Sequence, residues 1–290
     1  MLHASELTLS ETDARNLIRA QFPELAGAVV EAVADSGTVN YLFRVGETHC
    51  ARFPRTPDYE TSLLTEIRWL KAIVNRLSIS TPTVAANGVP GESYPLQWAL
   101  YHWISGNNFD PETDGCDPAN ALTLAEVLNE LHAIPTTGEL QSGRCARPHP
   151  RDYTIEPAIR FVSQTYDAAH LRSLWQDFLA LPAFTENPVW THGDLIPPNL
   201  LCRNGHLAAV IDWGSLGEGD PAIDYIVAFT LFRGEARDVF RRSLGIDEAS
   251  WQRARAYAFR QALRIIPYYH QSHAAFTRMA YHTLDEILST

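Results

Sequence analysis

The sequence predicts an α+β protein of two lobes, a smaller N-terminal lobe rich in strands and a larger, mainly helical C-terminal lobe. Apolar residues between 28 and 55 follow the two-residue period of strands, whereas after residue 118 they recur at helical spacing. A small polar stretch at 105–108 separates the two patterns. We therefore expect one lobe over 1–104 and a second over 105–290.

The first lobe is expected to begin with a helix capped by Ser10, because a serine hydroxyl can accept from the N–H groups that the first helical turn leaves unpaired. A turn at Gly46-Glu47 then joins two strand-like segments. The expected elements in chain order are a helix over 10–22, a hairpin of 39–45 and 49–55, a helix over 58–77, turns over 82–95 and a buried strand over 96–104.

The second lobe is expected to consist of helices that one hairpin interrupts. The segment 119–134 carries apolar residues three and four positions apart, as a core helix does. The expected helices are 119–134, 155–180, 222–244, 248–264 and 273–288, and 137–150 is expected to be a loop. An opening helix, strands with one further helix, and then helices around a single hairpin make the α+β class with segregated lobes.

The composition excludes several classes of protein. The 290 residues are 46% hydrophobic and 20% charged, as in ordinary globular proteins, and the formal net charge of −11 argues against a nucleic-acid partner. No apolar run has the length of a membrane span, and the first residues do not resemble a signal peptide. The four cysteines form no C-x-x-C pair. We expect a cytoplasmic protein without a membrane partner.

The acidic residues are unevenly distributed. Between Trp103 and Arg144 there are seven acids and no Lys or Arg, at positions 110, 112, 114, 117, 126, 130 and 139. Such a run is either a solvated surface or an acidic mouth that attracts magnesium or a cationic substrate. Both interpretations stay open at this point.

Residues 191–214 read THGDLIPPNLLCRNGHLAAVIDWG and predict a hairpin with polar residues at its base. Asn204-Gly205 is typical of a two-residue turn with positive φ at both positions. In that register Asn199 and Asp212 become diagonal neighbours, roughly 7–8 Å apart at Cα, which suits one hard cation bound by both. Asp194 precedes Asn199 by five residues. The pattern indicates metal and phosphate chemistry.

HGDLIPPN followed by IDWG resembles the catalytic core of the aminoglycoside phosphotransferase family, the small-molecule branch of the protein-kinase-like superfamily, to which macrolide phosphotransferases are related. Protein kinases carry H-R-D-x-x-x-x-N followed by D-F-G. Here Asp194 and Asn199 keep the first spacing, and Asp212 follows after thirteen residues. The resemblance implies a bilobal kinase-like fold, Mg²⁺, and ATP or GTP as co-substrate.

The resemblance also implies roles for the residues of the core. Asp194 is the expected catalytic residue, which orients the acceptor hydroxyl and accepts its proton. Asn199 and Asp212 are expected to hold magnesium on the nucleotide phosphates. The expected supports of the loop are His192, Gly193 and Asp224, although an acid in the segment GDPAID can equally cap a helix.

The nucleotide-binding residues implied by the resemblance lie in the first lobe. Arg52 occupies the position of the phosphate-pairing Lys of kinases, and Glu66 is its expected ion-pair partner. Ser36 and Gly37 belong to a turn that resembles the one over the phosphates, although it has a single glycine. The expected hinge, whose backbone meets the purine, consists of Tyr101, His102, Trp103 and Ile104.

We therefore predict a small-molecule O-phosphotransferase that acts on an acceptor hydroxyl, with a cationic aminoglycoside-type antibiotic as the leading class of acceptor. A macrolide phosphotransferase and a metabolic kinase for an amino alcohol or a sugar share the same core. Two alternatives of another class are a non-catalytic nucleotide-binding module and a metal-dependent hydrolase that uses His192, Asp194 and Asp212.

Overall fold

A computed structural model describes residues 6–33 and 39–289 and divides the chain into two compact units. Unit 1 comprises Met1–Asn107 with Ala208–Gly214, and unit 2 comprises Asn108–Leu207 with Ser215–Thr290. The N-terminal part is built on a sheet and the C-terminal part is mainly helical, so the expected fold class is confirmed. The assignment of nucleotide-binding and catalytic roles to lobes 1–104 and 105–290 stays a prediction.

Unit 1 contains a five-stranded antiparallel sheet in the order β1-β2-β3-β5-β4. Its strands are β1 (Val30–Ala32), β2 (Asn40–Val45), β3 (His49–Pro54), β4 (Val84–Gly88) and β5 (Trp98–His102), and its helices are α1 (Glu11–Gln21), the 3₁₀ turn η1 (Pro23–Leu25) and α2 (Pro57–Ile73). Ser10 caps α1 as expected, because its hydroxyl accepts from Asp13 N–H. The pairing of Val45 with His49 confirms the β2–β3 hairpin.

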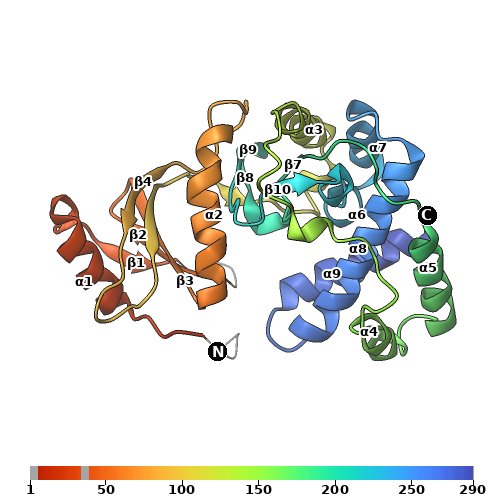
Figure 1. Ribbon diagram of the computed structural model, residues 1–290, viewed down its shortest axis with the longest axis horizontal. Helices are drawn as coiled ribbons and strands as arrows, with labels where there is room; N and C mark the ends of the chain where they lie inside the picture. Colours follow the sequence, from red (N-terminus) through yellow and green to blue (C-terminus); the bar gives the residue numbers. More distant parts are fainter. Residues whose placement is uncertain (1–5, 34–38, 290) are drawn as a thin grey trace. The chain divides into compact units, whose positions relative to one another are not determined.

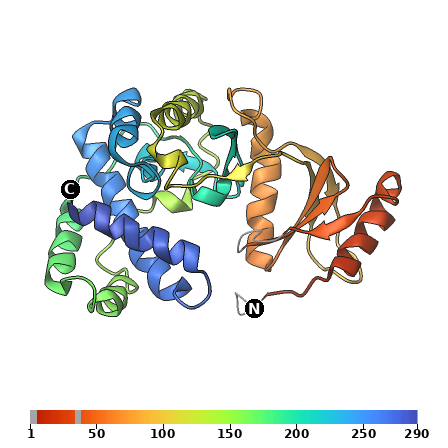
Figure 2. The ribbon, with the colours of Figure 1, turned by 180° about the vertical axis from the view of Figure 1, so that it is seen from behind.

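The two helices α1 and α2 lie on opposite faces of this sheet (Figures 1 and 2). Alternate residues of a strand point to opposite faces, so each strand serves two cores. Phe43, Phe53 and Trp98 pack with α1, whereas Cys50 and Tyr101 pack on the other face with Leu63 of α2. Arg52 follows Cys50 by two positions in β3, so it also points to the α2 face.

Two expectations for unit 1 were wrong. Helix α2 ends at Ile73, not at residue 77, because the following turn tightens into an Arg76 N–H to Ile73 carbonyl bond. The segment 84–88, expected as turns, is strand β4. Its Gly88 is required because a Cβ there would lie 2.0 Å from the indole of Trp98. A glycine that signals close packing can thus be mistaken for a turn signal.

Unit 2 is organised around one long helix, α8. Its helices are α3 (Pro118–His132), α4 (Ile155–Val162), α5 (Ala168–Ala180), α6 (Val227–Thr230), α7 (Gly234–Ser243), α8 (Glu248–Tyr269) and α9 (Ala274–Ser289), and its 3₁₀ turns are η2 (Asp114–Cys116), η3 (Gly143–Cys145), η4 (Pro197–Asn199) and η5 (Pro221–Ile223). Helices α4, α5, α6 and α9 all contact α8. Figures 1 and 2 show α8 and α9 side by side in blue.

Three helix boundaries in unit 2 differ from the expectation. The segment 155–180 is two helices, because Asp167 caps a new one by accepting from the N–H groups of Ala169 and His170. The segment 222–244 is divided into η5, α6 and α7, and a positive φ of 50° at Gly234 marks the start of α7. Helix α8 extends to Tyr269, beyond the expected end at residue 264, with Pro267 in its last turn.

The expected hairpin is present as β8 (Leu200–Arg203) and β9 (His206–Val210). Asn204 and Gly205 have φ values of 53° and 80°, as a two-residue turn of the expected type requires. Asn199, however, lies in η4 and not in β8, while Asp212 follows the end of β9 with φ 61°. The argument that made them diagonal neighbours on paired strands was therefore wrong, since neither residue is in a strand.

Three short strands were not expected. They are β6 (Asn107–Asn108), β7 (Val189–Thr191) and β10 (Gly217–Gly219), and β7 pairs antiparallel with β10. They are too short for a recognisable alternation of apolar and polar residues. Within residues 6–33 and 39–289, no helix combines the length and apolarity needed to cross a membrane.

Candidate active site

In unit 1, the guanidinium of Arg52 joins two carboxylates. Its Nη1 donates to Glu66 Oε1 and Oε2 at 2.7 and 3.0 Å, and its Nη2 donates to Asp212 Oδ1 at 2.8 Å. Burial alone would lower the pKa of Arg52, but the charges of Glu66 and Asp212 hold that pKa well above its ordinary value. The expected Arg52–Glu66 ion pair is present, while the role of Arg52 toward a nucleotide stays a prediction.

The segment that follows β9 supplies Asp212 and a further hydrogen bond to Glu66. Asp212 has a left-handed backbone conformation, which Asp tolerates better than most residues. The chain thereby turns so that Trp213 N–H donates to Glu66 Oε2 at 2.7 Å, and the indole of Trp213 donates to the Val210 carbonyl at 3.0 Å. Glu66 is fully buried. A buried carboxylate with a guanidinium and an N–H as donors has the partners that its charge requires.

The backbone of the expected hinge is partly engaged. His102 N–H donates to the Thr83 carbonyl at 2.9 Å, and Trp103 N–H donates to the Thr48 carbonyl at 2.8 Å. Tyr101 lies within β5, with its buried ring 5.3 Å from the guanidinium carbon of Arg52. Among the four hinge residues, the N–H of Ile104 is therefore the best candidate donor to a purine. Ser36 and Gly37 lie outside the residues that the structure describes.

In unit 2, two hydrogen bonds hold the backbone of Asp194, one at its N–H and one at its carbonyl. Its N–H donates to Nδ1 of the buried His192 at 3.2 Å, and its carbonyl accepts from Asn199 Nδ2 at 2.8 Å. This use of Nδ2 leaves Asn199 Oδ1 as the oxygen that could ligate a cation. The Asp194 side chain is 23% exposed, so a solute can reach its carboxylate.

Asp224 supports the loop of Asp194 through hydrogen bonds to its backbone. Its fully buried carboxylate accepts from His192 N–H at 2.7 Å and from Gly193 N–H at 2.8 Å. Burial raises the pKa of Asp224 to about 7, against the opposing effect of the two N–H groups and with a further contribution from the charge of Asp194. The helix cap in this segment is instead Asp220, which accepts from Ala222 N–H.

Gly193 is the residue whose conformation shapes the loop. Its φ is 77°, and a Cβ at this position would lie 2.8 Å from the Ser215 carbonyl oxygen. Both the backbone conformation and the space therefore require glycine. This explains physically why the loop reads H-G-D, with no room for the Arg that protein kinases have there.

Arg144 is a residue of this site that sequence reasoning missed. It lies in η3, fifty positions before Asp194, and its Nη2 is 3.6 Å from Asp194 Oδ1. Its Nε donates to Ser215 Oγ at 3.3 Å. No spacing rule connects an arginine in a predicted loop to a carboxylate so far along the chain. Only the tertiary structure brings them together.

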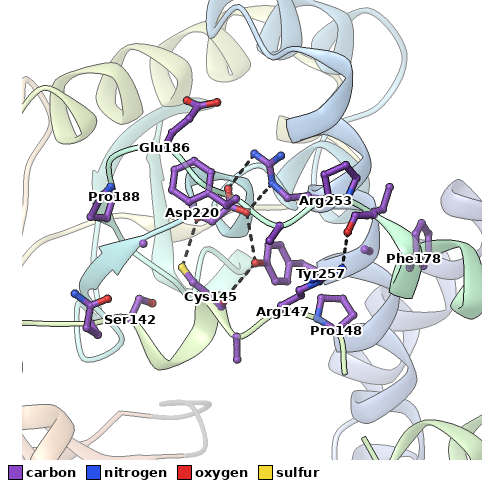
Figure 3. A pocket seen from close by; sticks show the side chains of 18 of the residues that line it. Ser142, Cys145, Arg147, Pro148, Phe178, Glu186, Pro188, Asp220, Arg253 and Tyr257 are labelled. Atoms are coloured by element: carbon purple, nitrogen blue, oxygen red, sulfur yellow. Dashed lines mark hydrogen bonds and ion pairs between the residues drawn. The ribbon is translucent and has the colours of Figure 1, made fainter. Parts of the chain in front are cut away.

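A cavity of about 390 Å³ lies within unit 2, beside the turn that carries Arg144 (Figure 3). Across it Arg253 Nε donates to Asp220 Oδ2 at 2.7 Å, and Tyr257 donates to the Cys145 carbonyl at 3.0 Å. Burial raises the pKa of the Cys145 thiol to about 11, so this thiol is protonated at neutral pH. The residues predicted to carry catalysis do not line this cavity.

Asn199 and Asp212 both offer oxygen atoms, the hard ligands that magnesium prefers, and their expected joint role as magnesium ligands stays a prediction. Among the described residues, no three His, Cys, Asp or Glu side chains cluster as a metal site. A metal-dependent hydrolase would need such a cluster. A kinase-type site does not, because the nucleotide phosphates supply further ligands.

A family model described as "Phosphotransferase enzyme family" matches residues 30–258. A curated relative, the uncharacterised protein YcbJ of Bacillus subtilis (strain 168), is 30% identical over 174 residues, which cover 56% of this chain and 54% of the relative. The chain thus matches about half the length of that relative.

Many solved structures resemble most of this chain, and two of them illustrate the range of named activities. The GDP and kanamycin complex of APH(2″)-IIIa is 19% identical, with a TM-score of 0.71 over 95% of this chain and 97% of the other. The macrolide 2′-phosphotransferase MphH from Brachybacterium faecium is 19% identical, with a TM-score of 0.61 over 92% and 98%. At this identity the likeness concerns the fold, and it agrees with the expected kinase-like class.

Proposed function

Since this chain belongs to the phosphotransferase enzyme family, we propose that it transfers the γ-phosphate of ATP or GTP to a hydroxyl of a small molecule in a magnesium-dependent reaction. The observation that carries this proposal is the Asp194 loop. Two backbone contacts fix Asp194, and its accessible carboxylate follows a glycine turn braced by the buried Asp224. These contacts support the proposed role of Asp194 as general base, because such a base has to be held in position.

The proposed role of Asp194 is to bind the acceptor hydroxyl and to take its proton as the oxygen attacks phosphorus. Phosphoryl transfer demands mainly alignment and charge neutralisation from the protein. The hydrogen bonds of His192 and Asn199 to the backbone of Asp194 supply the alignment, because they restrict where its carboxylate can lie.

The proposed role of Arg52 is to bind the phosphates with a guanidinium that Glu66 keeps in place. Its planar fork can hold a carboxylate with one edge and a phosphate oxygen with another. When bound by Asn199 and Asp212, magnesium supplies further neutralisation of the phosphate charge. Asp212 already accepts from Arg52, so the cation and the metal ligand are linked through one side chain.

The candidate acceptors and nucleotides belong to a few classes of molecule. Similar structures are complexes with GDP and kanamycin, or with ATP and streptomycin, and another is a macrolide 2′-phosphotransferase. Aminoglycosides, macrolides, amino alcohols and sugars, each with ATP or GTP, therefore make up the first panel. An aminoglycoside acceptor would make the enzyme an antibiotic-resistance factor.

The test is nucleoside diphosphate release with magnesium across this panel, with Asp194→Asn alongside the unchanged protein. We expect acceptor-dependent release that falls about 10³-fold in the variant, the typical contribution of a general base. Asp238→Asn, at an exposed position of α7, is the matched control and should leave the rate unchanged. Equal rates in the two variants would contradict the role of Asp194, and nucleotide binding without turnover would indicate a non-catalytic module.

A further inference from the structure

The turn that carries Arg144 is attached to α8 at two consecutive carbonyls. Tyr257 Oη donates to the Cys145 carbonyl at 3.0 Å, and Arg260 Nη1 donates to the Ala146 carbonyl at 2.7 Å. Figure 3 shows the first of these bonds, with Tyr257 projecting from α8 toward Cys145. The two donors are three positions apart and share a helix face. The position of Arg144 beside Asp194 is therefore built by α8 and does not depend on the loop alone.

This attachment brings three guanidinium groups together. Arg264 lies one turn after Arg260 on α8, and Arg144 lies two residues from the carbonyl that Arg260 binds. Burial lowers the pKa of Arg260, and the like charges of Arg264 and Arg144 lower it further, while Asp152 raises it. Like charges held in proximity favour an anion that neutralises them. We call Arg144, Arg260 and Arg264 the arginine cluster.

The acids in the vicinity leave this cluster positive. The three guanidinium groups face two carboxylates, that of Asp152, which also accepts from the N–H and hydroxyl of Thr154, and that of Asp194, the proposed base. Among the described residues, no carboxylate lies within 4 Å of Arg260 or Arg264, whereas Arg253 of the same helix is neutralised by Asp220. Arg144 and Arg264 are exposed, so a solute can reach both.

Several of the acids between Trp103 and Arg144 contact groups other than the arginine cluster. Asp110 and Asp114 accept backbone N–H groups of their own loop, Asp117 caps α3, and Glu112 pairs with Arg233 at 2.9 Å. Four of the seven acids thus have local structural partners. These contacts give a structural role to that part of the run.

We propose that the acceptor carries an acidic group, a carboxylate or a phosphate, which the arginine cluster binds while the acceptor hydroxyl lies at Asp194. The proposal rests on the phosphotransferase function proposed above and names its substrate class. It disfavours a polycationic aminoglycoside, because each ammonium group near the cluster would be repelled.

The distance between Arg144 and Asp194 would let Arg144 leave Asp194 and bind the acidic group of the acceptor. At 3.6 Å the two groups attract each other but form no direct hydrogen bond. An incoming acid can bind Arg144 with charge-assisted hydrogen bonds of better geometry. Arg144 then turns from Asp194 to the acceptor, whose hydroxyl lies at the Asp194 carboxylate. Binding of the acidic group and placement of the hydroxyl at Asp194 are thereby coupled.

The first experiment measures binding of three related sugars of negative, zero and positive charge, glucuronate, glucose and glucosamine, by NMR titration of the full-length protein. We expect glucuronate to bind most tightly and glucosamine least. Arg144→Gln and Arg264→Gln, both at exposed positions, should each weaken glucuronate binding about tenfold, as the loss of one charge-assisted hydrogen bond does. Arg242→Gln, an exposed arginine of α7, is the matched control and should change nothing.

The second experiment needs no acceptor and decides the question if none of the sugars binds measurably. Ala146→Cys places a thiol at an exposed position beside the cluster. We expect an anionic methanethiosulfonate reagent to modify it several-fold faster than a cationic one, in a ratio that Arg264→Gln brings toward one. The ratio cancels the intrinsic reactivity of the thiol. Equal or faster modification by the cation, or tighter binding of glucosamine, would overturn the proposal.

Failure of this inference is distinct from failure of the phosphotransferase function. Turnover of aminoglycosides with no preference for acids would leave the enzyme intact and remove the acidic acceptor. If Arg144 served the nucleotide instead, Arg144→Gln would raise the KM for nucleotide with every acceptor and leave glucuronate binding unchanged. That outcome also contradicts the proposal.

Discussion

Glu66 and Asp224 are both fully buried carboxylates, yet they are satisfied by different kinds of partner. Glu66 accepts from the guanidinium of Arg52 and from one backbone N–H. Asp224 accepts from two backbone N–H groups. A cation compensates a full charge, while N–H dipoles compensate part of it, and the pKa of Asp224 accordingly rises to about 7. Glu66 is thus held by a salt bridge, whereas Asp224 has no cation as a partner among the described residues.

The largest expected effect is that of breaking the ion pair. Arg52→Met leaves Glu66 buried without its cation, and such a loss typically costs about 3–5 kcal/mol of unfolding free energy. The measurement is urea denaturation followed by fluorescence of the tryptophans. Arg52→Met/Glu66→Met is the control, since replacing both partners by apolar groups removes the unpaired charge and should restore much of the stability. A single variant as stable as the unchanged protein would contradict the importance of the pair.

The second effect concerns the pH dependence of stability that the shifted pKa of Asp224 should cause. Its pKa is about 7 when folded, against an ordinary value of 3.8. The folded state therefore binds more protons between these values, and the stability contribution of Asp224 is full below pH 4 and lost as the pH rises through 7. From pH 5 to 7 this amounts to roughly 2–3 kcal/mol.

Asp224→Asn should remove this part of the pH dependence, because an amide does not titrate. The measurement is a series of denaturation curves from pH 5 to 8 for both proteins. The variant should also be less stable at pH 5 by about 1–2 kcal/mol, since its amide nitrogen cannot accept the N–H of His192 or Gly193. Parallel pH profiles in the two proteins would show that Asp224 keeps its charge throughout.

The smallest expected effect tests the loop that Asp224 braces. Gly193→Ala combines a positive φ with a contact to the Ser215 carbonyl, whereas Gly205→Ala has a positive φ of 80° and open space. The strain alone costs about 1 kcal/mol, so Gly205→Ala should lose that amount and Gly193→Ala about 1 kcal/mol more. Diphosphate release should fall in Gly193→Ala alone. Equal stability and activity of the two variants would argue against a tight glycine turn at Asp194.

The sequence predicted the parts of the site that local spacing encodes. Asp194 and Asn199 are five residues apart, and the structure joins them through one hydrogen bond. Glu66 was expected as the partner of Arg52 because of the resemblance to kinases, and the structure contains this ion pair. The α+β class followed from the change of apolar period, and the turn at Asn204-Gly205 followed from the φ values that these residues favour.

The remaining features depend on tertiary contacts. Arg144 reaches Asp194 because α8 holds η3, and no local pattern announces that contact. The engagement of the His102 and Trp103 N–H groups was hidden because backbone hydrogen bonds leave no trace in side-chain identity. Strand β4 was missed because Gly88 serves the packing of Trp98, although it resembles a turn residue. The break at Asp167 had a local signal, a capping residue, which the apolar periodicity obscured.

The seven residues Ala208–Gly214 belong to unit 1, although about a hundred residues of unit 2 precede them in the chain. They include Asp212, the Trp213 N–H that Glu66 accepts, and the Val210 N–H that donates to the Ser80 carbonyl at 3.0 Å. During synthesis, the N-terminal unit therefore stays incomplete until residue 214 has left the ribosome. An isolated fragment ending at residue 107 would lack one carboxylate of its own ion-pair network, and it should need these seven residues, supplied as a peptide, to reach full stability.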